Sequence, residues 1–212
     1  MQAISNLRNR IEPKFAGLNG EKDNGNGSLM RIAPLIPYIN GLVEEQQIQI
    51  ISEVSSLTHR HPRSILACIF LCKFAIQYLA TKEIPTAFAY TQKEIKYLLT
   101  QEKFKNECSH FDRLVNLTYE QFRNIAENDI KSTGYVIDTL EASFWSIFNN
   151  NDFKDSVLCA VNLGYDADTV GAITGALAGI IYGHDSIPEE WLNVLARKED
   201  IIELANKLDS VN

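Results

Sequence analysis

The sequence predicts an all-α protein, and three observations support that class. Apolar residues recur at intervals of three and four in most segments, which is the spacing of a buried helical face. No segment alternates apolar and polar residues as a half-buried strand does, and no internal repeat is present. The 212 residues, 45% of them hydrophobic and 22% charged, suffice for a single well-packed domain over 1–212.

Charge and cysteine usage argue against several classes of partner. The formal net charge is −7 and no basic run occurs, which disfavours nucleic acid and an anionic membrane surface. The N-terminus is polar and lacks the apolar segment of a signal peptide. The four cysteines lack the spacing of zinc ligands, and Cys68 and Cys72 lie in an apolar run, as buried thiols do. A reduced, cytoplasmic location is expected.

The N-terminal segments combine a short helix with turn-forming residues. A helix over the first residues should end before Pro13. Residues 20–27, GEKDNGNG, contain two Asn-Gly pairs and predict a turn. Ser28 is then a suitable N-cap for a helix that Pro34 and Pro37 kink or end. A glycine-rich loop before a helix either cradles an anion through its N–H groups or simply connects two elements.

Two longer helices follow, joined by a turn with two histidines. Periodicity predicts a helix over 44–57 and a strongly apolar core helix over 63–79. Pro62 suits the first turn of the second helix, with His61 at its cap. His59 lies in the connecting turn, where it is either polar surface or, with His61, part of a ligand site.

Further helical regions follow along the rest of the chain. Amphipathic helices are predicted over 86–99 and 152–163, an apolar helix after Gly134 up to Phe148, and one or two helices over 188–208. Residues 101–123 show the least periodicity, so we expect short helices and loops there and assign them no function.

Residues 162–183, NLGYDADTVGAITGALAGIIYG, concentrate the candidate chemistry of the chain. Asp166, Asp168 and Thr169 place two carboxylates and a hydroxyl at the start of a small, apolar helix. Such oxygens are ligands that Mg²⁺ or Mn²⁺ prefers, while an isolated carboxylate at this place is an ordinary helix cap. Spacing alone leaves both interpretations open.

Glycines recur every four residues along the same helix, which puts them on one helical face. Each costs about 1 kcal/mol of helix stability relative to alanine, which indicates a close approach by another backbone. The pattern also occurs in membrane helix dimers, but this apolar run is too short to span a bilayer. A buried central helix of a soluble protein is therefore expected. The glycines are Gly171, Gly175, Gly179 and Gly183.

These motifs, in this order along the chain, resemble the ADP-ribosylglycohydrolase family, of the dinitrogenase reductase-activating glycohydrolase type. The resemblance rests on NGNGSLMRIAPL, THRHP, GYVIDTLEASFWSIF and VLCAVNLGYDADTVGAITGALAGIIYG. It implies a multi-helix orthogonal bundle around a binuclear Mg²⁺ (or Mn²⁺) site. It also implies hydrolysis of the glycosidic bond between ADP-ribose and a protein side chain or small acceptor.

The resemblance assigns roles to individual residues. The C-terminal metal motif of the family, which also supplies catalytic carboxylates, corresponds to Asp166, Asp168 and Thr169. Its substrate-binding positions correspond to Asn26, Gly27, Ser28, His59 and Tyr135. From the sequence alone, Tyr135 is either a core aromatic or a lid on a ligand.

The sequence also departs from the family pattern in two respects. In the family, an N-terminal Gly-Asp motif and a Thr-Asp-Asp-Thr segment supply the other half of the metal site, and this sequence contains no Asp-Asp pair. We therefore expect an N-terminally truncated version of the fold that holds one metal weakly or none. Tyr165 stands where the family usually has a small residue, so its phenol is expected to narrow the cleft or reorient Asp166.

Three functions remain open at this point. The chain is an ADP-ribosylglycohydrolase completed by a second polypeptide or a swapped neighbour, an inactive relative that binds ADP-ribose-like ligands, or a structural or interaction protein without a ligand. ADP-ribose or an ADP-ribosylated protein is the expected partner. An apolar face left by the missing helices predicts a homo-oligomer or a complementing chain.

Overall fold

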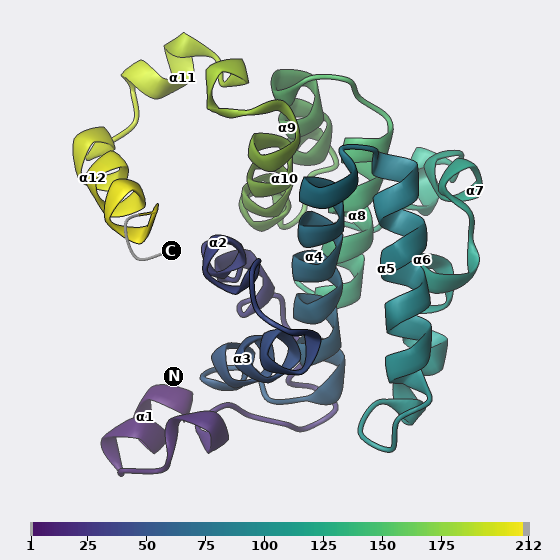
Figure 1. The fold of residues 1–212 in the computed structure, drawn as a ribbon, viewed down its shortest axis with the longest axis vertical. Coiled ribbons are helices and arrows are strands. Elements are labelled where there is room, and N and C mark those ends of the chain that lie inside the picture. The colour runs from purple at the N-terminus through teal and green to yellow at the C-terminus, as the bar shows by residue number, and fades with distance from the viewer. Residues whose placement is uncertain (1, 210–212) are drawn as a thin grey trace.

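The computed structural model describes residues 2–209, which form the helical assembly shown in Figure 1. Over this range no strand forms, as predicted, and extended pairing is limited to two isolated bridges. The α-helices are α1 (Gln2–Arg8), α2 (Leu35–Ile39), α3 (Glu44–Ser56), α4 (Pro62–Thr81), α5 (Ile84–Leu99), α6 (Asp112–Asn116), α7 (Tyr119–Arg123), α8 (Val136–Phe148), α9 (Phe153–Asn162), α10 (Ala167–Tyr182), α11 (Glu189–Asn193) and α12 (Lys198–Asp209). The 3₁₀ helices are η1 (Pro13–Phe15), η2 (Leu29–Arg31), η3 (Lys105–His110), η4 (Glu127–Asp129) and η5 (His184–Ser186).

The helix α4 lies at the centre of the bundle, with α3, α5, α8 and α10 packed around it (Figure 1). Its length and composition would suit a membrane span, but 67% of that span is buried inside the protein. The core helix predicted over 63–79 is therefore confirmed. Its start also follows the prediction, because Pro62 occupies the first turn and the His61 side chain accepts a hydrogen bond from the Arg63 N–H at 3.2 Å.

A cluster of aromatic rings fills the space between α4, α5 and α8. Phe144 of α8 lies edge-on to Phe74 and Phe70 of α4, with ring centroids 4.7 and 5.3 Å apart. Phe88 of α5 and Phe148 of α8 extend the cluster, with an edge-on contact at 5.0 Å. Each of these rings is almost fully buried, so the cluster joins the three helices into one core.

The glycine-rich helix α10 lies at the side of this core, and the prediction of a buried central helix is wrong for it. One face, with Val170, Ile173 and Leu177, is buried against the bundle, whereas the opposite face carries the exposed Ala172. The central positions belong instead to α4 and α8, which have large apolar side chains on most of their circumference. A helix with small residues fills less volume and suits the edge of the bundle.

The glycines of α10 do allow a close approach, and the neighbour is α9. A Cβ atom at Gly171 would lie 3.0 Å from a methyl of Val161, and one at Gly175 would lie 3.8 Å from a methyl of Val157. Further along, a Cβ at Gly179 would meet open space. The close neighbours of these glycines are therefore side-chain methyls of α9, and the tight approach is confined to Gly171.

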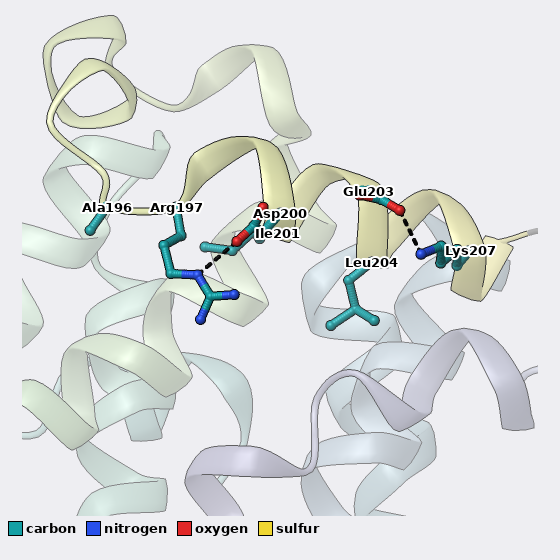
Figure 2. Close-up of a pocket in the computed structure, with 7 residues that line it drawn as sticks. All are labelled: Ala196, Arg197, Asp200, Ile201, Glu203, Leu204 and Lys207. Atoms are coloured by element: carbon teal, nitrogen blue, oxygen red, sulfur yellow. Dashed lines mark hydrogen bonds and ion pairs between the residues drawn. The ribbon is translucent and has the colours of Figure 1, made fainter.

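The terminal helices α1 and α12 stand away from the bundle on the same side of the molecule (Figure 1). The apolar side chains of Ile201 and Leu204 on α12 are exposed. Figure 2 shows the open groove of about 510 Å³ along this helix. Its lining residues are Ala196, Arg197, Asp200, Ile201, Glu203, Leu204 and Lys207.

Candidate functional site

The predicted site residues come from distant segments that meet at the N-terminal ends of α8 and α10. The Asn26 N–H donates to the Gly134 carbonyl at 3.1 Å, and the Val136 N–H donates to the Asn24 carbonyl at 3.0 Å. The Asp166 N–H donates to the Ser132 carbonyl at 3.0 Å. These backbone bonds hold the glycine-rich loop and the start of α10 against the same short segment before α8.

The carboxylate of Asp166 is oriented by hydrogen bonds to both of its oxygens. The Asn26 side-chain amide donates to Oδ2 at 2.5 Å and to the Thr139 hydroxyl at 2.8 Å. The Thr169 hydroxyl donates to Oδ1 at 3.2 Å. The amide of Asn26, predicted to bind substrate, thus has both of its hydrogens directed at protein oxygens and orients Asp166. Thr139 of α8 has no distinctive sequence signal and was missed.

Two oxygens of this set, from Asp166 and Thr169, have the spacing of neighbouring ligands of a divalent cation. Neighbouring corners of a Mg²⁺ octahedron lie about 3 Å apart, because Mg–O distances are about 2.0–2.1 Å. The Thr169 hydroxyl and Asp166 Oδ1 are separated by 3.2 Å, and Asp168 follows on the exposed side of the first turn of α10. Among residues 2–209, no group of three or more His, Cys, Asp or Glu side chains could hold a metal. Asp166, Asp168 and Thr169 would therefore leave several positions of a cation to water.

The alternative role of Asp166 as a helix cap finds less support in the geometry. Asp166 is the N-cap residue of α10, but its side chain makes no capping hydrogen bond to the helix backbone. A carboxylate at a helix N-terminus still gains from the helix dipole. The side-chain contacts of Asp166, however, run to Asn26 and Thr169, as expected for a positioned ligand.

Tyr165 does not narrow the site in the way expected from the sequence. It adopts φ +51° directly after Gly164 at φ +78°, so two consecutive residues lie in the left-handed region. Such a conformation costs a residue with a side chain about 1–2 kcal/mol. The Tyr165 side chain is 91% exposed and points into solvent, so the tight turn, and not the phenol, directs the chain into Asp166.

His59 lies against the glycine-rich loop, as its predicted role requires. A Cβ at Gly27 would be 2.8 Å from His59 Cε1, and one at Gly25 would be 3.5 Å from Nε2. The Nδ1 atom is 2.9 Å from the Thr58 hydroxyl. Burial, followed by the nearby positive charge of Arg31, lowers the pKa of His59. His59 is therefore a neutral hydrogen-bonding group at pH 7.

We expect Gly27→Ala to impair ligand binding with little loss of stability. The new methyl would collide with the His59 ring, and the ring is the end of a side chain that can rotate away. The free energy of unfolding should therefore change by less than about 1 kcal/mol, while the imidazole leaves its position. Calorimetric titration with ADP-ribose and urea denaturation would measure the two effects. Gly179→Ala, where a Cβ meets open space, is the control, and equal binding by both variants would contradict the expectation.

Ser28 differs from the other loop residues, because its side chain belongs to the core. It is fully buried, and the Cys68 thiol contacts its hydroxyl at 3.5 Å. Burial raises the pKa of Cys68, so this thiol is not a nucleophile. Ser28 also caps no long helix, since the segment after it is only the 3₁₀ turn η2. The Ser28 side chain therefore contributes to the core, and the substrate-binding role of Ser28 stays a prediction.

Tyr135 is half-buried at the start of α8, and residues outside the sequence motifs hold it. Its hydroxyl is 3.2 Å from His110 Nδ1, and the guanidinium of Arg63 lies over its ring at 5.8 Å from the centroid. Burial raises the pKa of Tyr135, so the phenol remains protonated. His110 belongs to the region 101–123, to which the sequence analysis assigned no function because it lacks periodicity.

A polar pocket of about 340 Å³ is bordered in part by Glu141 and by His110, which contacts the Tyr135 hydroxyl. Glu141 is buried and pairs with Arg113 at 3.3 Å. Burial raises the pKa of Glu141 to about 7, against the smaller lowering effect of Arg113. The carboxyl is thus partly protonated at neutral pH, in contrast to an ordinary surface glutamate.

Glu141→Gln is expected to stabilise the protein at pH 8. A glutamate whose folded pKa lies above its unfolded value stabilises the fold below pH 4.5, and this contribution is lost as pH rises from 4.5 to about 7. Glutamine mimics the protonated form, so the free energy of unfolding of the variant should be about 2 kcal/mol higher at pH 8. This figure already allows for the loss of the ion pair with Arg113. Urea denaturation at pH 5 and pH 8 measures the gain. Glu120→Gln, on the exposed face of α7, provides the control, and an equal response of both variants to pH would contradict the assignment.

Comparison with known proteins agrees with the motifs and the geometry. The family model for ADP-ribosylglycohydrolase matches residues 1–212. ADP-ribosylarginine hydrolase Tri1 of Serratia proteamaculans is 33% identical over 185 residues, which are 87% of this chain and 46% of that protein. ADP-ribosyl-[dinitrogen reductase] glycohydrolase of Rhodospirillum rubrum is 28% identical over 178 residues, 84% of this chain and 53% of that protein.

A solved structure shows the same fold. The structure titled ADP-ribosylglycohydrolase-related protein complex superposes with a TM-score of 0.80 at 28% identity, over 99% of this chain and 67% of that one. The chain spans about half the length of the curated relatives described above. The fold, the ordered motifs and the match over all residues lead to one conclusion. This chain belongs to the ADP-ribosylglycohydrolase family.

Proposed function

We propose that this chain hydrolyses the glycosidic bond between ADP-ribose and a protein side chain or small acceptor, with Mg²⁺ (or Mn²⁺) as cofactor. The observation that carries the proposal is the orientation of Asp166. Its carboxylate is fixed by Asn26, 140 residues away in the sequence, and by Thr169 of the following turn. A carboxylate with both oxygens directed in this way, beside an exposed second carboxylate, suits cation binding and charge stabilisation.

The chemistry of the proposed reaction divides among the site residues. A bound Mg²⁺ supplies a Lewis acid for the ribose hydroxyls and for water. Asp166 and Asp168 provide negative charge where an oxocarbenium-like transition state develops positive charge. Neutral His59 and the backbone N–H groups around Gly27 offer hydrogen bonds to the diphosphate side of the ligand. The half-buried ring of Tyr135 provides a wall for the ligand.

The acceptor proposed for the first test is an ADP-ribosylated arginine. The names of two related proteins, from Serratia proteamaculans and Pseudomonas putida, specify ADP-ribosylarginine. The experiment incubates the chain with an ADP-ribosylated arginine peptide and Mg²⁺ and measures released ADP-ribose. Release that disappears in Asp168→Ala supports hydrolysis.

Ligand binding without turnover is the second candidate function. It is favoured by the small carboxylate set, since residues 2–209 contain no group of three or more His, Cys, Asp or Glu side chains that could hold a metal. In that case no ADP-ribose is released, while ADP-ribose still raises the melting temperature of the protein. The absence of any response to ADP-ribose or Mg²⁺ would leave a structural role and would refute both proposals.

Association with another chain is also proposed, as a homo-oligomer or with a complementing chain. Large apolar side chains are exposed on both terminal helices, among them Leu7 of α1 and Leu204 of α12. A monodisperse monomer by light scattering at micromolar concentration would count against self-association.

The free cysteines support a reduced, cytoplasmic location, which fractionation would test.

A further inference from the structure

The first turn of α4 carries a buried arginine that two glutamates from different segments hold. Arg63 Nε donates to Glu107 of η3 at 2.7 Å, and Nη1 donates to Glu21 of the glycine-rich loop at 2.8 Å. The side chains of Arg63 and Glu107 are only 5% and 7% exposed, whereas that of Glu21 is 69% exposed. A buried guanidinium requires such partners, because an unpaired one is strongly destabilising.

The same guanidinium also holds the aromatic ring of the candidate site. It lies over the Tyr135 ring at 5.8 Å from the centroid, while His110 of η3 contacts the Tyr135 hydroxyl at 3.2 Å. The ring is thus held at its face by Arg63 and at its edge by His110. Glu107 and His110 both come from η3, so this short element supports the arginine and the phenol together.

Hydrogen bonds, together with the backbone of the glycine-rich loop, connect this cluster to Asp166. The first turn of α4 also anchors the loop, since the Ser64 hydroxyl donates to Asn24 Oδ1 at 3.1 Å, and the Asn24 amide donates to the Glu21 carbonyl at 3.0 Å. The Asn24 carbonyl accepts a hydrogen bond from the Val136 N–H. Two residues further along the loop, the side chain of Asn26 donates to Asp166 and orients its carboxylate. Movement of the loop at Glu21 would therefore disturb the carboxylate.

We propose that Arg63 is a positioning residue, which fixes the Tyr135 ring and the glycine-rich loop relative to each other before a ligand binds. The nature of that ligand, ADP-ribose, rests on the function proposed above. Direct binding of the diphosphate by Arg63 is disfavoured, because its Nε and Nη1 atoms are already bonded to carboxylates. Glu21 and Glu107 place two carboxyl groups against the guanidinium, where they compete with an anionic ligand.

The test compares Arg63→Met with Lys73→Met, a matched loss of a buried cation on the same helix. Lys73 pairs with Glu94 at 3.1 Å, on a part of α4 that faces α3 and α5. Hydrogen exchange of the Asn26 and Val136 amides, relative to the amides of the α4 core, reports on the loop in the free protein. We expect about a tenfold faster relative exchange in Arg63→Met and no change in Lys73→Met.

Binding provides the second readout. Calorimetric titration should show that the dissociation constant for ADP-ribose rises about tenfold in Arg63→Met and less than about twofold in Lys73→Met. Arg63→Lys should fall between wild type and Arg63→Met in both measurements, because it keeps the charge but loses the planar fork. Should Arg63→Met fail to fold, Glu107→Gln weakens the same cluster and should shift both readouts in the same direction.

The two proposals fail in different ways. Equal relative exchange of the two amides in Arg63→Met and Lys73→Met would overturn the positioning role, whatever the affinity for ADP-ribose. Faster exchange in Arg63→Met, together with no binding of ADP-ribose by the wild-type protein, would uphold the positioning role and refute the proposed ligand.

Discussion

Asp166→Asn is expected to reduce the release of ADP-ribose from an ADP-ribosylated arginine peptide by about a thousandfold, equivalent to about 4 kcal/mol. The substitution removes the charge that the proposed cation and the proposed transition state would require. It also places either an amide nitrogen or a neutral oxygen opposite the donors of Asn26 and Thr169, which now contact the two carboxylate oxygens. The shape of the side chain is kept, so the fold should persist.

Measurement of Mg²⁺ binding separates this role from a purely structural one. The melting temperature of the wild-type protein should rise with added Mg²⁺, and this response should disappear in Asp166→Asn. Asp152→Asn is the matched control, because Asp152 caps α9 with a hydrogen bond to the Asp155 N–H at 2.8 Å and lies outside the site. A Mg²⁺ response retained by Asp166→Asn would show that the cation binds elsewhere.

Phe144→Ala is expected to have the largest effect on stability, a loss of about 3–5 kcal/mol in the free energy of unfolding. The ring is fully buried and contacts Phe74 at 4.7 Å and Phe70 at 5.3 Å between centroids. It also lies 5.6 Å from Phe148 of its own helix. Truncation would remove these contacts and leave a cavity where α4, α5 and α8 meet, which the surrounding helices can close only in part.

Urea denaturation would measure this loss. If only stability changes, the slope of the unfolding free energy against urea concentration stays the same in the variant. Tyr97→Ala on α5 is the control, because this aromatic side chain is 64% exposed and its removal opens no cavity. A loss below about 1.5 kcal/mol for Phe144→Ala would mean that the core collapses around the missing ring.

The helices could be predicted from the sequence because their periodicity is local. The helix predicted over 44–57 corresponds to α3, Glu44–Ser56, and the helix over 63–79 to α4, Pro62–Thr81. Which helix lies at the centre could not be predicted in the same way. Burial of a helix depends on the elements that pack against it. The sequence of α12 has an apolar face, but no other element among residues 2–209 covers Ile201 and Leu204, and the periodicity of one helix cannot reveal this.

The site was predictable only in part, for a related reason. The resemblance to a family identified Asp166, Thr169 and Asn26, and the structure brings them together. Arg63 and its partners in η3 were missed, because an ion pair between residues 44 positions apart leaves no periodic signal in a single sequence. The aperiodic region 101–123 therefore supplied two residues that support the site.

The contact between the imidazole of His59 and the loop at Gly27 has a consequence for the evolution of this protein. The requirement for glycine at position 27 comes from the His59 ring, because a Cβ atom at this position would lie only 2.8 Å from His59 Cε1. A substitution at position 27 is therefore tolerated only together with a change at position 59. Across homologous sequences, a side chain larger than hydrogen at position 27 should occur together with a smaller residue at position 59, and an alignment would reveal this as covariation between the loop and the turn before α4.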